Sequence, residues 1–274
     1  MTERPDAYAT FWTEFGRAVK EGLLNDPDNR EEILAICSFG TTHRPEGAEP
    51  APTTLAAYVE RMPEGQDAVY YLTGESATAV ESSPHLEGLR AKGYEVLVLT
   101  DPIDELWVDV VGEYEGRPLQ SAAKGQVDVQ TEEERAAAQE RERDFADLLA
   151  WMGGALGDQV KQVRLSTRLT TSPACVVGDT DDLTPTLERM YRAMGQELPP
   201  VKRILELNPT HPLVVGLHDA HAAAGSDVPG SLAETAELLY DLALLAEGGD
   251  LGDPSRFVRL VADRLQQGLG AAQQ

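Results

Sequence analysis

The chain has 274 residues, enough for two domains that each bury a core. Its 23 Lys and Arg residues are outnumbered by 47 Asp and Glu residues, which gives a formal net charge of −24. A chain this acidic lacks the basic clusters that bind nucleic acid phosphates or an anionic membrane surface, so both are excluded as partners. The charge favours either a soluble, self-repelling surface or attraction to basic, partly unfolded proteins.

Targeting signals and cysteine usage indicate a cytoplasmic protein. The first residues, MTERPDAYAT, lack the apolar core of a signal peptide, and no run approaches the roughly 20 apolar residues that would span a bilayer. Cys37 and Cys175 lie far apart in apolar runs without metal or redox spacing. We therefore predict two reduced, buried thiols and no disulfide.

The first 47 residues have helical periodicity. Apolar side chains recur at helical spacing at Tyr8, Phe11, Trp12, Phe15 and Val19. Asp26 and Pro27 can start a second helix, so residues 6–47 are predicted to be helical. The proline-rich stretch His43–Pro52 predicts a loop after it.

Residues 53–126 alternate between helix and strand patterns. The apolar runs at 68–72 and Tyr94–Leu99 predict central strands, and helices between strands favour parallel pairing. Asp101 can cap a helix whose first residue is Pro102, and an edge strand is expected before residue 121. This part of the chain is therefore predicted to form a small α/β layer.

A second domain is predicted after residues 126–131. Thr131 and Glu134 form a capping-box pattern that opens a helix to about Leu149. Three strands and four further helices are expected: strands Gln162–Leu169, Ala174–Val177 and Ile204–Leu207, and helices 183–194, 212–223, 231–246 and 254–267.

The helix at 183–194 is strongly amphipathic. Leu183, Leu187, Met190 and Tyr191 form one stripe, while Glu188, Arg189 and Arg192 take the other face. Periodicity alone is typical of an ordinary helix that packs into the core, and an exposed binding surface is the alternative.

The last two helices carry more apolar surface than one packing interface requires. The candidate residues are Leu232, Leu238, Leu239, Leu242, Leu245, Phe257, Leu260, Val261 and Leu265. An intramolecular helical hairpin or a second copy of the chain could cover them.

No pattern of catalytic, cofactor-binding or metal-binding residues is found. His211, His218 and His221 lack a Cys nearby to complete a zinc site, and the acidic residues around Asp179 lack calcium-loop spacing. No Gly-x-Ser-x-Gly elbow or glycine-rich phosphate loop occurs. A small α/β enzyme with its site near 73–75 and 100–104, and an acidic docking module for a basic partner, are the alternatives to a binding protein.

Five stretches nevertheless carry a specific resemblance. They are FWTEFGRAVKEGLLNDPDNREEI at 11–33, YVERMPEGQDAVYYLTGES at 58–76, SPHLEGLRAKGYEVLVLTDPIDE at 83–105, LSTRLTTSPACVV at 165–177 and LELNPTHPLV at 205–214. Their order and spacing resemble HtpG, the bacterial branch of the ninety-kilodalton heat-shock chaperone family, over nearly the whole chain.

The resemblance implies an α+β / α/β fold built from the C-terminal portion of the family. Residues 1–126 would be a distal middle-domain segment, helical over 6–47 and a small α/β/α layer over 53–126. Residues 131–274 would be an α+β domain for dimerisation and client binding. The family's N-terminal ATPase domain, which binds ATP and Mg, is expected to be absent. The chain is therefore expected to be no enzyme and to hold no cofactor.

The same resemblance implies a chaperone fragment of the stress response that binds unfolded or partly folded clients. Its expected partners are a second copy, joined through a four-helix bundle, the clients, and the missing N-terminal half. The matched client-binding positions are Glu105, Leu106, Trp107, Leu183, Leu187, Met190 and Tyr191. Relatives carry Trp at the position of Leu106, and a shift by one residue turns a side chain by about 100° around a helix.

Overall fold

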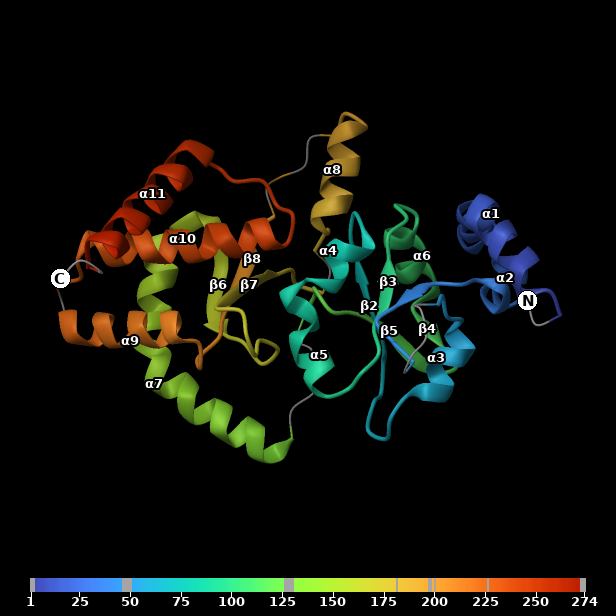
Figure 1. The fold of residues 1–274 in the computed structure, drawn as a ribbon, viewed down its shortest axis with the longest axis horizontal. Coiled ribbons are helices and arrows are strands. Elements are labelled where there is room, and N and C mark those ends of the chain that lie inside the picture. The colour runs from blue at the N-terminus through green and yellow to red at the C-terminus, as the bar shows by residue number, and fades with distance from the viewer. Residues whose placement is uncertain are drawn as a thin grey trace. The chain divides into compact units, whose positions relative to one another are not determined.

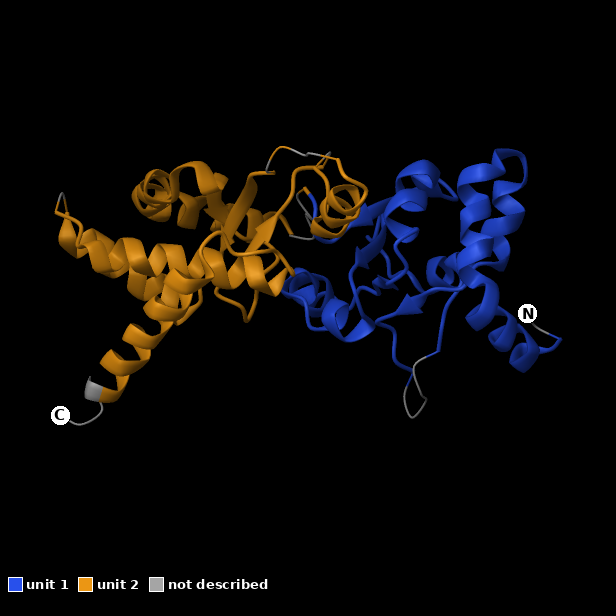
Figure 2. Ribbon diagram, turned by 90° about the horizontal axis from the view of Figure 1, so that it is seen from above, with its two compact units in different colours: residues 1–124 blue, residues 125–274 orange. Residues whose placement is uncertain are grey.

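A computed structural model of the chain describes residues 3–45, 51–125, 131–180, 182–196, 199, 201–225 and 227–271. The chain forms two compact units, residues 1–124 and residues 125–274 (Figure 2). Most of the predicted boundary at 126–131 lies outside the described residues. No helix among the described residues is long and apolar enough to cross a membrane.

Unit 1 is built on a five-stranded sheet in the order β1-β3-β2-β5-β4. Its strands are β1 (Gly40–Thr41), β2 (Val69–Thr73), β3 (Leu97–Leu99), β4 (Glu113–Tyr114) and β5 (Arg117–Ser121). Its helices are α1 (Pro5–Asn25), α2 (Arg30–Ile36), α3 (Leu55–Arg61), α4 (Ala77–Glu81), α5 (Glu87–Ala91) and α6 (Asp104–Val111), with short 3₁₀ helices at Pro27–Asn29 and Pro84–Leu86 (Figure 1).

The central strands of unit 1 pair as the sequence predicted. β2 runs parallel to β3, with Tyr71 opposite Leu97, and parallel to β5 on its other side. Because side chains alternate along a strand, Val69 and Tyr71 face one side of the sheet. That side packs on α1, α2, α3 and α6, through a core that includes Leu23, Tyr58 and Trp107.

Three local predictions in unit 1 are corrected. Residues 6–47 are not helical throughout, because Gly40 and Thr41 form an edge strand antiparallel to β3. The strand at Tyr94–Leu99 pairs only from Leu97 onward. Helix α6 begins at Asp104, two residues after Pro102, because the Asp101 N–H donates to Asp104 Oδ2 at 3.0 Å and closes a turn before the helix.

Unit 2 holds a three-stranded sheet in the order β6-β8-β7. Its elements are α7 (Glu132–Leu156), a 3₁₀ helix η3 (Gly157–Gln159), β6 (Val160–Leu165), β7 (Ala174–Val177), α8 (Pro185–Ala193), β8 (Arg203–Leu207), α9 (Pro212–Ala224), α10 (Gly230–Ala246) and α11 (Pro254–Ala271). The Thr131–Glu134 capping box is present at the start of α7. This helix runs seven residues beyond the predicted end at Leu149, because Met152 and Leu156 are buried in the core.

The two faces of the unit 2 sheet differ in chemistry. One face packs on α7, α9 and α10 through apolar side chains such as Leu148, Leu205 and Leu239. The other face carries a buried charge cluster, in which Glu206 accepts from Arg168 Nε at 3.0 Å and from Arg164 Nη2 at 2.7 Å. Charges this deep in a protein are tolerated when they are paired and hydrogen-bonded, and this network meets that condition.

Both cysteines are buried free thiols, as predicted. Cys37 lies in the core of unit 1, and burial raises the pKa of its thiol to about 12. Cys175 lies on β7 opposite Glu206 of β8. The thiolate is the reactive form of cysteine, so Cys37 is expected to be inert.

Candidate functional site

The proposed client-contact residues on α6 turn out to be largely core. Trp107 is fully buried, stacks on Phe39 with ring centroids 5.1 Å apart, and donates from Nε1 to Asp104 Oδ1 at 2.6 Å. Glu105 is buried as well, and only Leu106 is half-exposed. Glu105 and Trp107 thus offer no surface to a client in this structure, since the Trp107 indole lies in the core of unit 1, and client contact at these positions stays a prediction.

Helix α8 also departs from the predicted pattern. Thr184 caps it by accepting from the Leu187 N–H at 3.2 Å, and Pro185 fills its first position. Leu187 is buried with 4% of its surface exposed, whereas Leu183, Met190 and Tyr191 are half-buried. The expected exposed stripe is therefore incomplete. Glu188, next to Leu187, forms an ion pair with Arg203 of β8 and so holds the first turn of α8 down.

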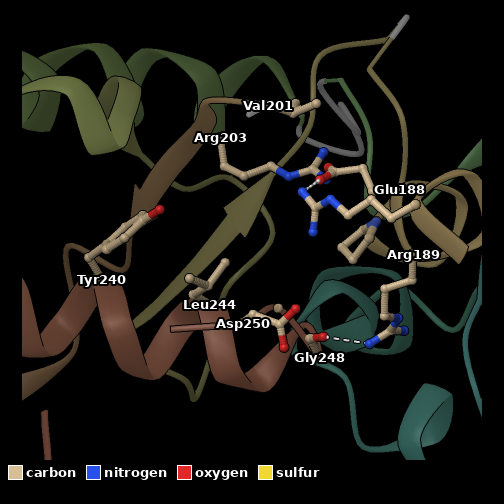
Figure 3. Close-up of a pocket in the computed structure, with 11 residues that line it drawn as sticks. Glu188, Arg189, Val201, Arg203, Tyr240, Leu244, Gly248 and Asp250 are labelled. Atoms are coloured by element: carbon tan, nitrogen blue, oxygen red, sulfur yellow. Dashed lines mark hydrogen bonds and ion pairs between the residues drawn. The ribbon is translucent and has the colours of Figure 1, made fainter. Parts of the chain in front are cut away.

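The charged face of α8 lines a cavity rather than open solvent (Figure 3). This cavity has a volume of about 160 Å³ and lies between α8, the start of β8 and the end of α10. Glu188 reaches Arg203 across it, and Arg189 Nη1 donates to the Gly248 carbonyl at 2.9 Å (Figure 3). Glu188 and Arg189, on the face opposite the apolar stripe, thus attach α8 to the rest of unit 2.

One carboxyl group near this cavity is poorly compensated. Glu247 follows the last residue of α10, and its buried Oε2 has no hydrogen-bond partner among the described residues. Burial raises the pKa of Glu247 to about 8, while the charges of Arg203 and Arg168 oppose the shift. Near neutral pH this carboxyl group is therefore largely protonated.

The predicted dimerisation residues on α10 and α11 fall into two groups, one buried and one exposed. Leu238, Leu239 and Leu260 are buried within the chain, and Leu232, Phe257 and Val261 are half-buried. Leu239 and Leu232 pack in the core of unit 2, so the buried positions offer little surface to a second copy, and their role in dimerisation stays a prediction. One side of the wide apolar surface of α10 packs into the core of unit 2.

The second group is exposed. Leu242 and Leu245 on α10 have 47% and 42% of their surface exposed, and Leu265 on α11 has 65%. The structure adds Val258 and Leu269, which periodicity had not singled out and which are also exposed. With Val261 these residues follow the spacing 258, 261, 265 and 269 along one face of α11, a pattern that the sequence already contained.

Histidines on α9 have structural surroundings. His218 stacks on Phe145 with centroids 4.3 Å apart, and His221 packs against Trp151 at 5.0 Å. Both rings thereby attach α9 to α7. Among the described residues, no group of three or more His, Cys, Asp and Glu side chains converges for a metal ion.

The ends of the parallel strands in unit 1, where an enzyme of this layout would have its site, hold a buried ion pair instead. Lys20 Nζ lies 2.7 Å from Asp101 Oδ2 and 2.8 Å from Asp104 Oδ1. Asp104 is fully buried and also accepts from the Trp107 indole. These groups satisfy one another, and their arrangement is that of a structural cluster.

Comparison with known sequences identifies the family. A sequence model described as "Hsp90 protein" matches residues 1–274. This chain belongs to the Hsp90 family. It is 60% identical over 268 residues to "Chaperone protein HtpG" of Rhodococcus jostii (strain RHA1), which is 96% of this chain and 41% of that protein. The protein of the same name from Salinispora arenicola (strain CNS-205) is 62% identical over 270 residues, 97% of this chain and 42% of its own length.

The Hsp90-family chain thus spans about two fifths of the length of these relatives. The HtpG of Mycolicibacterium gilvum (strain PYR-GCK) gives the same picture, with 58% identity over 274 residues, 98% of this chain and 41% of the relative.

These matches correct two expectations. The chain was expected to be no enzyme and to hold no cofactor, because the ATPase domain was taken to be missing. The Hsp90 match covers residues 1–274, so the whole chain belongs to a family that uses ATP and Mg. Neither expectation stands.

Two cavities of unit 2 nevertheless do not fit magnesium–ATP. The cavity of about 420 Å³ beside α10 is lined by five carboxylates, whose charge would repel a triphosphate. The cavity beside α8 has a volume of about 160 Å³, and its three arginines include Arg203, already paired with Glu188. Neither of these two cavities is therefore a nucleotide site.

Proposed function

We propose that this chain acts as the dimerising and client-binding part of an Hsp90-family chaperone. In this proposal, unit 1 corresponds to the distal segment of the family's middle domain, and unit 2 to its C-terminal dimerisation domain. Binding of unfolded or partly folded proteins in the cytoplasm belongs to the same proposal. Family membership and the exposed apolar surfaces of unit 2 support it.

The observation that carries the proposal is the exposed apolar surface of α10 and α11. Five large apolar side chains on these two helices are between 42% and 70% exposed: Leu242, Leu245, Val258, Leu265 and Leu269. Fully burying a side chain of this kind is worth roughly 1.5 to 3 kcal/mol, so burying the exposed parts of five would contribute several kcal/mol to an association. Monomeric proteins rarely expose so many on neighbouring helices.

The hairpin of α10 and α11 is already secured within the chain. Arg256 Nη2 donates to Glu237 Oε2 at 2.7 Å, and Arg264 Nη2 lies 3.3 Å from Glu234 Oε2. Leu260 of α11 is buried, with 4% of its surface exposed. Since the intramolecular interface is complete, the outward-facing leucines and valines are available to a second copy, and two hairpins would form a symmetric four-helix bundle.

The client surface that the structure supports is smaller than the resemblance implied. Met190 and Tyr191 are half-buried on the second turn of α8, and Met194 at its end is 67% exposed. Thioether side chains adapt to partners of different shape. We therefore place client contact at the end of α8, away from the buried Leu187, with Leu106 as an additional half-exposed position.

Sedimentation velocity tests the dimer. The double variant Leu242→Asp plus Leu265→Asp places two charges on the exposed stripe without touching the core, and we expect a dimer of the unmodified chain to become a monomer. The matched control, Ala136→Asp plus Ala137→Asp, adds the same charges to the exposed start of α7 and should remain dimeric. A stable dimer in both variants would remove α10 and α11 as the interface.

The same preparations test the client surface. Met190→Asp plus Met194→Asp is expected to reduce the suppression of aggregation of reduced insulin B chain severalfold while leaving the sedimentation coefficient unchanged. The α7 control should suppress aggregation as well as the unmodified chain. Equal suppression by the α8 variant would refute the assignment of client contact to the end of this helix.

A further inference from the structure

A second cavity of unit 2 has a lining of unusual charge. It has a volume of about 420 Å³ and lies where η3, the residues before β8, the second half of α10 and the approach to α11 meet. Its lining includes five carboxylates, which are Asp158, Glu237, Asp241, Asp250 and Asp253. Lys202 is the one cation among the residues that line it.

The cations around the cavity are already engaged. Lys202 Nζ lies 2.6 Å from Asp158 Oδ1. Arg256, on the first turn of α11, binds both carboxylate oxygens of Glu237. Neither the Lys202 ammonium nor the Arg256 guanidinium binds Asp241 or Asp250, while Asp253 Oδ1 accepts from the Arg256 backbone N–H at 2.9 Å.

Asp241 is the group that distinguishes this cavity from an ordinary acidic surface. It lies in the second half of α10 with only 8% of its surface exposed, and it lines the cavity. No hydrogen bond or ion pair from the described residues reaches its carboxylate. Its residue is largely buried while its carboxylate borders the cavity, so a cation that enters the cavity from outside can reach it and supply the missing partner.

The shape of the lining selects the kind of cation. No three metal-ligating side chains converge among the residues that the structure describes, so the carboxylates are too far apart to surround a single metal ion. Between them lie Val201, Tyr240 and Leu244, which offer apolar and aromatic surface. An arginine or lysine side chain, with an apolar stem and a charged end, matches both properties.

We infer that this cavity binds an arginine or lysine side chain of a basic polypeptide segment, with Asp241 as the ion-pair partner and Tyr240 and Leu244 against the stem. Glu237, Asp250 and Asp253 would add attraction at the rim. The inference does not rest on the proposed client surface, because neither the end of α8 nor the exposed leucines of α10 line this cavity.

The protonation of Asp241 agrees with such a role. Burial and the nearby charges of Glu237 and Asp253 together raise the pKa of Asp241 to about 6, and the charge of Arg256 opposes this rise. Asp158, Asp250 and Lys202 are the other charged groups at this cavity. An entering cation stabilises the ionised form, so binding is expected to be strong at pH 7.5 and to weaken below pH 6.

The test uses fluorescein-labelled Gly-Leu-Arg-Leu-Arg-Leu-Gly and the same peptide with citrulline, which is nearly isosteric and neutral, in place of arginine. Binding to the full chain is followed by fluorescence anisotropy at pH 7.5. We expect the arginine peptide to bind at least tenfold more tightly than the citrulline peptide. Asp241→Asn should abolish this preference, and Asp253→Asn should reduce it about threefold.

The matched control is Glu133→Gln, which removes one charge from the exposed first turn of α7 and should keep the full preference. Equal affinity of Asp241→Asn and the unmodified chain for the arginine peptide would overturn the inference, as would equal binding of the two peptides. Calorimetry with spermidine checks the source of the cation: tight, Asp241-dependent binding of spermidine without peptide binding would overturn the assignment to a polypeptide.

Discussion

Two buried aspartates, one in each unit, show how differently the same group can be used. Asp104 in unit 1 has no exposed surface and is surrounded by donors: Lys20 Nζ at 2.8 Å, the Trp107 indole at 2.6 Å and the Asp101 N–H at 3.0 Å. Asp241 in unit 2 is 8% exposed and has no hydrogen-bond or ion-pair partner among the described residues.

The difference distinguishes a carboxylate that stabilises the fold through its partners from a carboxylate that can bind a ligand. Burial raises the pKa of Asp104, but Lys20, Trp107 and the backbone of Asp101 all favour its ionised form. At Asp241 burial also raises the pKa, and the charges of Glu237 and Asp253 add to the shift. A charge surrounded by donors stabilises the fold only while each partner remains, whereas an unpartnered charge reduces stability until a ligand arrives.

The largest effect is expected from breaking the partnered group. Lys20→Met removes the ammonium from a pair whose side chains are 6% and 0% exposed, and leaves Asp104 buried without its counter-ion. We expect unit 1 to lose about 3 to 5 kcal/mol of unfolding free energy, measured from urea unfolding followed by tryptophan fluorescence in a Trp151→Phe background, which leaves only the tryptophans of unit 1.

The control for this variant lies one turn away on the same helix. Arg17 pairs with Glu21 at 3.9 Å on an exposed surface, so Arg17→Met should change stability by less than about 1 kcal/mol. Equal effects of the two substitutions would mean that the buried pair contributes no more than a surface pair.

A smaller gain in stability is expected from Glu247→Gln. Because the pKa of this buried carboxyl is raised to about 8, the folded state holds its proton more tightly than the unfolded state. The stability of the unmodified chain should therefore fall as pH rises from about 4 to about 8. Gln does not titrate, so its stability does not fall in this way. Glu247→Gln should therefore be more stable than the unmodified chain by about 1 to 3 kcal/mol at pH 8.5 and nearly equal to it at pH 4.

Thermal unfolding at a series of pH values from 4 to 8.5 measures this difference, with Glu133→Gln as a surface control that should follow the unmodified chain throughout. A constant difference at all pH values would show that the pKa of Glu247 is the same in the folded and unfolded states, and would contradict the raised value.

The smallest effect is expected at Asp241, because its carboxylate borders an open cavity. Its pKa is raised to about 6, so, as at Glu247, the folded state holds the proton more tightly than the unfolded state. The stability of the unmodified chain therefore falls as pH rises from about 4 to about 6. Asp241→Asn should raise the melting temperature at pH 7.5 and leave it unchanged near pH 4. A lower melting temperature at pH 7.5 would mean that the Asp241 carboxylate has a stabilising partner, as Asp104 does, and would contradict the difference between the two aspartates.

Local sequence patterns predicted most of the elements because the signals that start and end them act over a few residues. The Thr131–Glu134 capping box begins α7, and proline at the first position begins α8, α9 and α11, all near the predicted residues. The parallel pairing of β2 with β3 also followed from helices alternating with strands. The short edge strand β1 was missed, since two residues carry no periodicity of their own.

Periodicity identified which residues share a helix face, and only the tertiary structure decided what each face touches. The stripe on α8 is real, yet an ion pair between Glu188 and Arg203, 15 residues apart, holds its first turn down and buries Leu187. On α10, Leu239 lies in the core while Leu242 is exposed, although both belong to one wide apolar arc. Asp241 was not singled out at all, because the absence of a partner depends on where distant cations lie. Burial and charge compensation are sums over neighbours from the whole unit, and such sums cannot be read from the spacing of residues along one helix.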